Sequence, residues 1–132
     1  MKKSAKAQFV IKSWDEKPYS EGADSPKLTR ASVVKTFMGD LEGEGHVEYL
    51  MMYGNDGSAS FVGLERIVGK LAGKAGSFVL QRTGTFEGGV AKESYSVVPG
   101  SGTGELRGLR GEGTSALGHG TEYPFGLDWE LD

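Results

Sequence analysis

The chain contains no cysteine. This absence excludes disulfides, thiol nucleophiles and zinc–thiolate sites, and it fits a reducing compartment. Long apolar runs are also missing, and no segment approaches the ~20 residues that a membrane-spanning helix needs. Positive charge is not in excess, because 15 Lys and Arg against 18 Asp and Glu give a net charge of −3. We therefore expect a cytoplasmic protein with no membrane span and no nucleic acid as a partner.

Glycine is the residue in excess. The 22 glycines are about a sixth of the 132 residues, against a usual share of ~7%. Such a composition suits tight turns and weakens helices. The glycines also form a repeat, Gly-x-Leu-x-Gly, at residues 39–43, 69–73 and 104–108. Each copy lies between stretches rich in β-branched and aromatic residues, a pattern typical of β-hairpins.

Alternating sequences at both ends of the chain predict two further strands. Ala5, Ala7, Phe9 and Ile11 share one face of the first, and odd-numbered apolar residues from 123 to 131 share one face of the second. Three hairpins and two end strands give eight strands, a number that can close on itself. We therefore predict one all-β domain over residues 1–132, an eight-stranded antiparallel closed β-barrel built as a meander of Gly-rich hairpins. A twisted open sheet or a sandwich would fit the same strands.

A polar segment at residues 15–27 interrupts the pattern of strands. It contains Pro18, Gly22 and Pro26, which favour turns and irregular structure. We expect this segment to be a loop that covers one end of the barrel.

The second hairpin permits a prediction of register. A turn centred on Gly73 and Lys74 places residues of matched kind opposite each other, and it pairs Glu65 with Arg82. The face that carries this pair is the more apolar one, so we assign it to the barrel interior. Because removing one partner of a buried ion pair costs about 3–5 kcal/mol, the pair is either a structural clasp or the polar end of a ligand pocket.

The opposite face of this hairpin is also apolar. It carries Val62, Leu64, Val68 and Val79. An exterior with such a patch usually meets another surface. We therefore predict a homo-oligomer, most simply a dimer.

A row of alternating polar residues is a candidate metal site, comprising Asp40, Glu42, Glu44, His46 and Glu48. Side chains on one face of a strand are ~6–7 Å apart from one to the next, which is too wide for a shell around one ion. We interpret the row as a solvated outer face and predict no metal. The opposite face of this segment is apolar and belongs inside.

The glycine-rich residues 100–104 are a candidate phosphate loop. Nucleotide-binding loops of this kind need a following helix, and the glycines that continue to residue 113 argue against one. We therefore expect no cofactor. The two histidines lack a context that would place either beside a serine, so we assign no catalytic residue, and His119 is interpreted as a turn residue.

Several motifs resemble those of a known family. They are VGLER at 62–66, GSFVLQ at 76–81, GTF at 84–86 and GSGTGELRGLRGEG at 100–113, with KSWDE at 12–16 and PY at 18–19. Together they resemble the bacterial domain-of-unknown-function family 3224 over nearly the whole chain. The glycine-rich hairpin is more distantly similar to plant allene oxide cyclases and dirigent proteins. That resemblance implies an eight-stranded barrel that binds hydrophobic small molecules in its lumen and forms oligomers. The cyclase pocket includes a cysteine, which this chain lacks, so no catalytic residue is carried over.

Three functions remain open on these grounds. The first is a binding module that takes a small, largely apolar ligand in the lumen, with Glu65 and Arg82 as polar anchor and Tyr49 and Tyr53 in the wall. The second is a cyclase- or isomerase-type enzyme in which Glu65 acts as acid or base. The third is a structural or oligomeric domain without a ligand. A cavity of a few hundred Å³ would favour the first two, and a tight Glu65–Arg82 pair would favour binding over catalysis.

Overall fold

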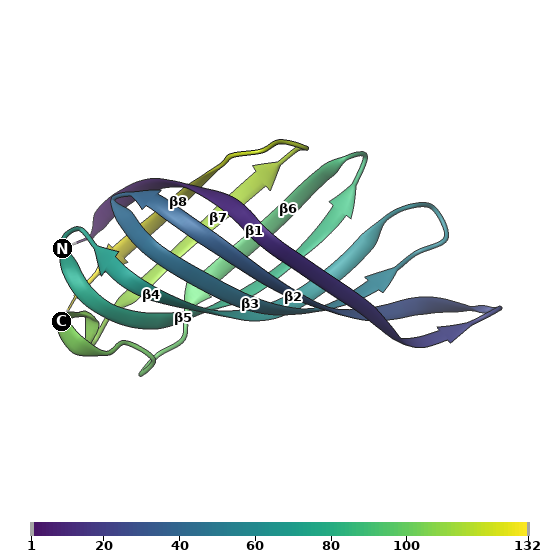
Figure 1. Cartoon of the computed structure of the whole chain (residues 1–132), viewed down its shortest axis with the longest axis horizontal. Coiled ribbons are helices and arrows are strands. Elements are labelled where there is room, and N and C mark those ends of the chain that lie inside the picture. The colour runs from purple at the N-terminus through teal and green to yellow at the C-terminus, as the bar shows by residue number, and fades with distance from the viewer. Residues whose placement is uncertain (1, 132) are drawn as a thin grey trace.

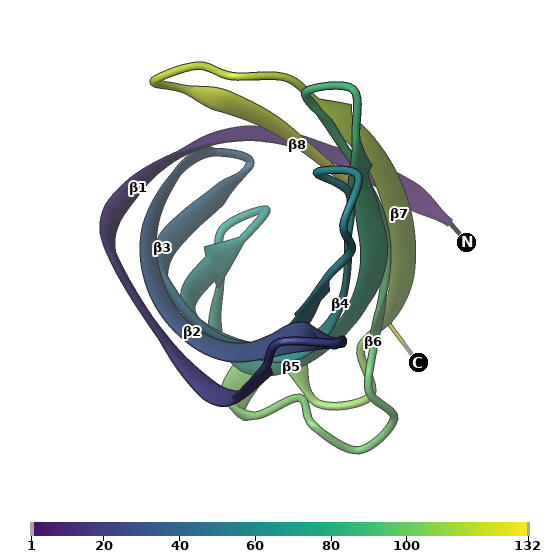
Figure 2. The same ribbon diagram turned by 90° about the vertical axis from the view of Figure 1, so that its right-hand side faces the viewer.

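The computed structural model describes residues 2–131, which form a closed antiparallel barrel of eight strands. Each strand pairs with the next one along the chain, and β8 pairs with β1 to complete the ring (Figures 1 and 2). The predicted fold is therefore confirmed. The elements are β1 (Lys3–Gly22), β2 (Ser25–Gly39), β3 (Leu41–Tyr53), β4 (Ala59–Leu71), β5 (Lys74–Glu87), β6 (Val90–Val97), a short 3₁₀ turn η1 (Gly104–Leu106), β7 (Arg110–Leu117) and β8 (Tyr123–Glu130).

The Gly-x-Leu-x-Gly repeat closes one end of the barrel. Its first two copies turn β2 into β3 and β4 into β5, and the third contains η1 in the β6–β7 connection. The central leucines Leu41, Leu71 and Leu106 are no more than 1% exposed and belong to one core cluster. We call this the plugged end; the chain termini lie near it, at the left of Figure 1. The other four connections surround the opposite end, which we call the open end.

The β4–β5 hairpin has the predicted faces but not the predicted register. It turns at Ala72 and Gly73, one residue earlier than expected, and both have positive φ angles, 51° and 82°. Glu65 therefore lies opposite Leu80 and not opposite Arg82, and every predicted pairing in the hairpin is displaced by two residues. The period of side chains along a strand is also two, so this displacement leaves each residue on its predicted face.

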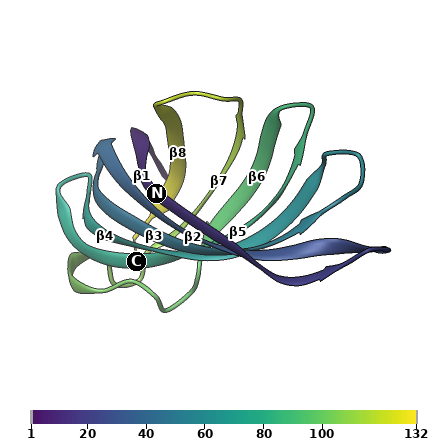
Figure 3. The ribbon, with the colours of Figure 1, turned by 45° about the vertical axis from the view of Figure 1, so that its right-hand side comes forward.

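The predicted loop at residues 15–27 is wrong. β1 continues to Gly22 and β2 begins at Ser25, so the segment is a long two-stranded hairpin. This hairpin projects beyond the open end (Figures 1 and 3). Both faces of a projecting hairpin meet water, so its sequence lacks the alternation of apolar and polar residues by which strands are recognised.

A bulge in β1 changes which residues point into the lumen. The β1–β2 register shifts between Ile11 and Ser13. Odd-numbered residues such as Phe9 face inward before the bulge, and the even-numbered Trp14 and Glu16 face inward after it. An extra residue of this kind re-aims the side chains that follow it. Ile11, predicted on the buried face, precedes the bulge and lines the open pocket, where it is 38% exposed.

The outer surface agrees with two sequence predictions. The acidic row from Asp40 to Glu48 faces outward. Val62, Leu64 and Val68 are each more than half exposed and form an apolar strip on the outside of β4. The homo-oligomer inferred from that strip stays a prediction. Within residues 2–131, no helix is long and apolar enough to cross a membrane.

Candidate functional site

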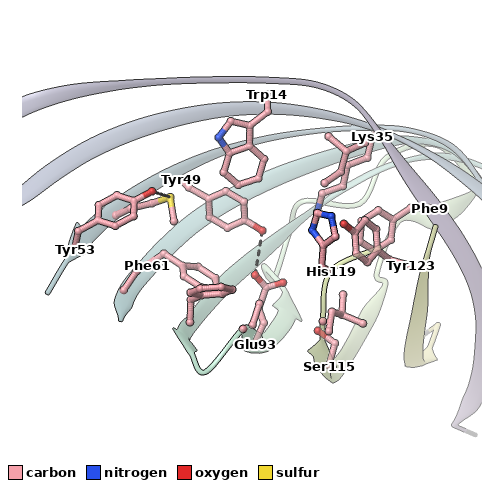
Figure 4. A pocket seen from close by; sticks show the side chains of 18 residues that line it. Phe9, Trp14, Lys35, Tyr49, Tyr53, Phe61, Glu93, Ser115, His119 and Tyr123 are labelled. Atoms are coloured by element: carbon pink, nitrogen blue, oxygen red, sulfur yellow. Dashed lines mark hydrogen bonds between the residues drawn. The ribbon is translucent and has the colours of Figure 1, made fainter. Parts of the chain in front are cut away.

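The open end of the barrel leads into a pocket of about 460 Å³. Residues from every strand line it, and most of the wall is apolar (Figure 4). The aromatic members of the wall are Phe9, Trp14, Tyr49, Tyr53, Phe61, Phe86 and Tyr123.

Inward-facing glycines make room for these rings. A Cβ atom on Gly63 would lie 2.7 Å from Cδ1 of Tyr49, and one on Gly84 would lie 2.7 Å from Cζ of Phe61. Each ring therefore occupies the space that a side chain of the neighbouring strand would fill. Glycines inside strands commonly mark such close approaches. Gly63 and Gly84 thus serve the shape of the lumen and not its turns.

A chain of polar contacts lies at and directly beneath the floor of the pocket. Arg82 Nε donates to Glu65 Oε1 at 2.7 Å, and Arg82 Nη1 donates to Glu93 Oε1. Lys35 Nζ lies 3.4 Å from Glu65 Oε2. Tyr49 Oη donates to Glu93 Oε2 at 3.0 Å, and Figure 4 shows these two side chains pointing toward each other. We call these five residues the floor network.

The floor network is deeply buried. Lys35, Glu65 and Arg82 are 4%, 0% and 2% exposed. Gly45 makes room for the Glu65 carboxylate, because a Cβ there would lie 2.5 Å from Oε2. The guanidinium carbon of Arg82 lies 4.7 Å from the ring centre of Tyr95, a cation–π contact. The two cations and two carboxylates of the network balance each other in charge.

Burial and neighbouring charges shift the pKa values of the network. Burial lowers the pKa of Lys35 to about 8, and the nearby Arg82 acts in the same direction. Burial alone would raise the pKa of Glu65, but the charges of Lys35 and Arg82 outweigh it and hold that pKa below its ordinary value. Burial raises the pKa of Tyr49 well above its usual value. Glu65 is therefore a carboxylate and Tyr49 a neutral phenol at neutral pH.

The lowered pKa of Lys35 predicts that stability rises with pH. Between about pH 8 and pH 10, the unfolded chain keeps a proton on Lys35 that the folded chain has lost, so the free energy of unfolding increases, by about 2 kcal/mol. Above about pH 10 the raised pKa of Tyr49 acts in the opposite direction. Urea unfolding at several pH values would measure the rise, and the Lys35→Met variant should not show it. An equal rise in both proteins would contradict the assignment to Lys35.

A second polar cluster lies at the rim of the pocket. Glu16 accepts hydrogen bonds from Trp14 Nε1 at 2.9 Å, from Thr29 Oγ1 at 2.7 Å and from Tyr53 Oη. Burial and the neighbouring Glu16 raise the pKa of Tyr53 to about 12. The Trp14 ring stacks near Tyr49, with ring centres 6.5 Å apart. These contacts hold the half-exposed Trp14 beside the mouth of the pocket.

The predicted site residues lie at two depths in the lumen, at the pocket wall and beneath the pocket. Tyr49 and Tyr53 line the pocket. Glu65 and Arg82 contact each other as inferred, but they lie beneath the floor and do not line the pocket. The charged residues that do line it, Lys35 and Glu93, were not singled out from the sequence.

A signal for these two residues was present in the sequence. Lys35 alternates with Val33 and Phe37, which face inward, and Glu93 alternates in the same way with Tyr95. A charged residue on an inward face of a predicted strand marks a buried polar site. Trp14 carried no such signal, because the bulge in β1 reverses the alternation before it.

Of the two other candidate motifs, residues 100–104 lie away from the pocket and His119 lies at its wall. In residues 100–104, Thr103 Oγ1 accepts from the backbone N–H of Ser77, and Ser101 Oγ accepts from that of Val79. The segment thus pairs with β5 near the plugged end. His119 belongs to the β7–β8 connection and lines the pocket. Among the residues that the structure describes, no group of three or more His, Cys, Asp or Glu is arranged to hold a metal.

Comparison with known proteins identifies a family. The family profile described as "Protein of unknown function (DUF3224)" matches residues 5–129. A crystal structure of a protein of unknown function from the same family, from Shewanella oneidensis MR-1, is similar, with a TM-score of 0.82 and 31% identity over 100% of this chain and 99% of that one. No curated protein matches. The distant similarity to allene oxide cyclases stays a prediction. The match over nearly the full length, together with the shared barrel, shows that this chain belongs to the DUF3224 family.

Proposed function

We propose that the protein binds a small, largely apolar molecule in the pocket at the open end of the barrel. The observation that carries this proposal is the pocket of about 460 Å³. Ligand sites in proteins are typically ~300–1,000 Å³ concavities with apolar and aromatic walls and a few placed polar groups. Aromatic rings on the wall and the charged floor of Lys35 and Glu93 fit this description.

The contrast between the two halves of the lumen argues against a purely structural barrel. Leu41, Leu71 and Leu106 fill the plugged half, where the larger core cluster lies. Protein interiors are normally packed with few voids larger than a water molecule. A barrel whose interior served only stability would be expected to fill both halves in the same way.

The state of Glu65 favours binding over acid–base catalysis. A general base must come within hydrogen-bond reach of the proton that it takes. Glu65 is fully buried beneath the floor, and Arg82 Nε is bonded to it at 2.7 Å. The positive charges around it also hold its pKa below the ordinary value. A ligand in the pocket therefore meets Lys35 and Glu93 before it meets Glu65.

Titration with the apolar fluorophore N-phenyl-1-naphthylamine tests the proposal. We expect saturable binding with one site per chain and a rise in fluorescence as the probe leaves water. The Ala91→Trp variant places an indole on the pocket wall and should weaken binding at least about tenfold, or about 1.4 kcal/mol. The Ala116→Trp variant is the matched control, because Ala116 is exposed on the outside of β7. Equal binding by the two variants, or no binding by the unmodified protein, would refute the proposal.

A further inference from the structure

We propose that the ligand is uncharged and carries a hydrogen-bond acceptor, such as a carbonyl oxygen, that binds the Lys35 ammonium at the floor of the pocket. This inference rests on the proposed function and specifies its chemistry. The lumen would then take neutral amphipathic molecules and discriminate against acids and amines with the same tail.

The Lys35 ammonium can donate a further hydrogen bond on the side that faces the pocket. An ammonium has three N–H donors. In the described part of the chain, Glu65 is the carboxylate within ion-pair distance of Lys35, at 3.4 Å, and Arg82 shares it. The ammonium also lies 4.7 Å from the ring centre of Phe9. This cation–π contact is electrostatic, and it occupies no N–H donor in a conventional hydrogen bond. Because Lys35 lines the pocket, an acceptor atom of a bound molecule can reach it.

Glu93 is less available than Lys35 for a hydrogen bond to a ligand, although it also lines the pocket. Its Oε1 accepts from Arg82, and its Oε2 accepts from the hydroxyl of Tyr49. Both carboxylate oxygens are therefore engaged within the floor network. The floor presents a donor at Lys35 more readily than an acceptor at Glu93, so the matching group on the ligand is an acceptor.

The charge balance of the floor decides between a neutral and a charged head group. Lys35 and Arg82 are balanced by Glu65 and Glu93 before any ligand enters. A ligand carboxylate would add a third anion close to two others, and a ligand ammonium would add a third cation. An uncompensated charge is costly in a buried site. A carbonyl or hydroxyl head avoids that cost and still binds the ammonium.

Displacement of bound N-phenyl-1-naphthylamine by ten-carbon competitors tests this inference at pH 7. We expect 2-decanone to displace the probe at concentrations at least about tenfold lower than decanoate or decylamine require. In the Lys35→Met variant, with the affinity of the probe measured again for that variant, 2-decanone should bind at least about tenfold more weakly than to the unmodified protein, and its advantage over decylamine should shrink because the floor now carries a net negative charge. Lys92→Met is the control, because Lys92 is exposed on the outside of β6, and it should keep the full preference.

The possible results separate this inference from the proposed function. Equal displacement by the three competitors, or a preference for decanoate, would overturn the neutral head group and leave the binding function standing. A failure of the unmodified protein to bind the probe would overturn both. The preference of the unmodified protein is measured without any substitution, so it decides the question even if Lys35→Met does not fold.

Discussion

The Arg82→Met variant is expected to lose about 3–5 kcal/mol of unfolding free energy. Arg82 is 2% exposed and pairs with both Glu65 and Glu93. Its removal would leave two carboxylates inside the barrel with Lys35 as the remaining cation of the network. The loss is comparable to a large part of the ~5–15 kcal/mol that stabilises a typical domain. Urea unfolding followed by circular dichroism would measure it.

The control for this variant is Arg66→Met, on the same hairpin. Arg66 is exposed on the outside of β4, so its replacement should change the unfolding free energy by less than about 0.5 kcal/mol. Neutralising one carboxylate together with the arginine, in Arg82→Met with Glu93→Gln, should recover part of the loss, because Lys35 and Glu65 would then remain as a balanced buried pair. A loss below about 1 kcal/mol for Arg82→Met alone would show that the network contributes little to the fold.

The Leu71→Ala variant is expected to lose about 2–5 kcal/mol, the range for a leucine removed from a packed core. Leu71 is fully buried in the plugged end, where Leu41 and Leu106 also lie. Strand and turn backbone surround this site, so it has little freedom to collapse around the lost methyl groups. Thermal and urea unfolding would both report the change.

The same substitution at Leu64 is the matched control. Leu64 is on β4 as well, but it faces outward and is 55% exposed, so Leu64→Ala should cost less than about 0.5 kcal/mol. The Leu71→Ala variant should also keep its affinity for N-phenyl-1-naphthylamine, because the plug and the pocket occupy opposite halves of the lumen. Equal losses from Leu71→Ala and Leu64→Ala would contradict the assignment of the repeat to a plug.

The sequence predicts the barrel and the faces of its strands, because both depend on a period of two that is read directly from the residues. Alternation placed Glu65, Arg82, Tyr49 and Tyr53 inside, and all four face the lumen. It fails where the chain departs from that period. The bulge in β1 reverses the alternation before Trp14, and the projecting hairpin at residues 15–27 has no buried face by which its strands can be recognised.

The register and depth of the site were harder to predict. A turn with Ala72 at a φ of 51° is uncommon, because residues with a Cβ atom rarely adopt that conformation. A turn centred on Gly73 was therefore predicted at the wrong position. The height of Glu65 within the lumen depends on how far neighbouring strands are staggered around the barrel. That stagger, and not the alternation, separates Glu65 below the floor from Lys35 at the pocket.

The pairing of glycines with large inward side chains has a consequence for how such barrels diverge. Gly45 borders Glu65, and Gly63 borders Tyr49, each on an adjacent strand. A side chain at Gly45 would meet both Glu65 and the ring of Phe37, and one at Gly63 would meet the backbone oxygen of Glu48 as well as Tyr49, so a larger residue at either glycine requires a smaller neighbour and a shift of the surrounding atoms. The two positions of a pair should therefore change together among relatives. By exchanging which strand supplies the bulk, such coupled changes would move the walls of the lumen while the barrel keeps its strand order.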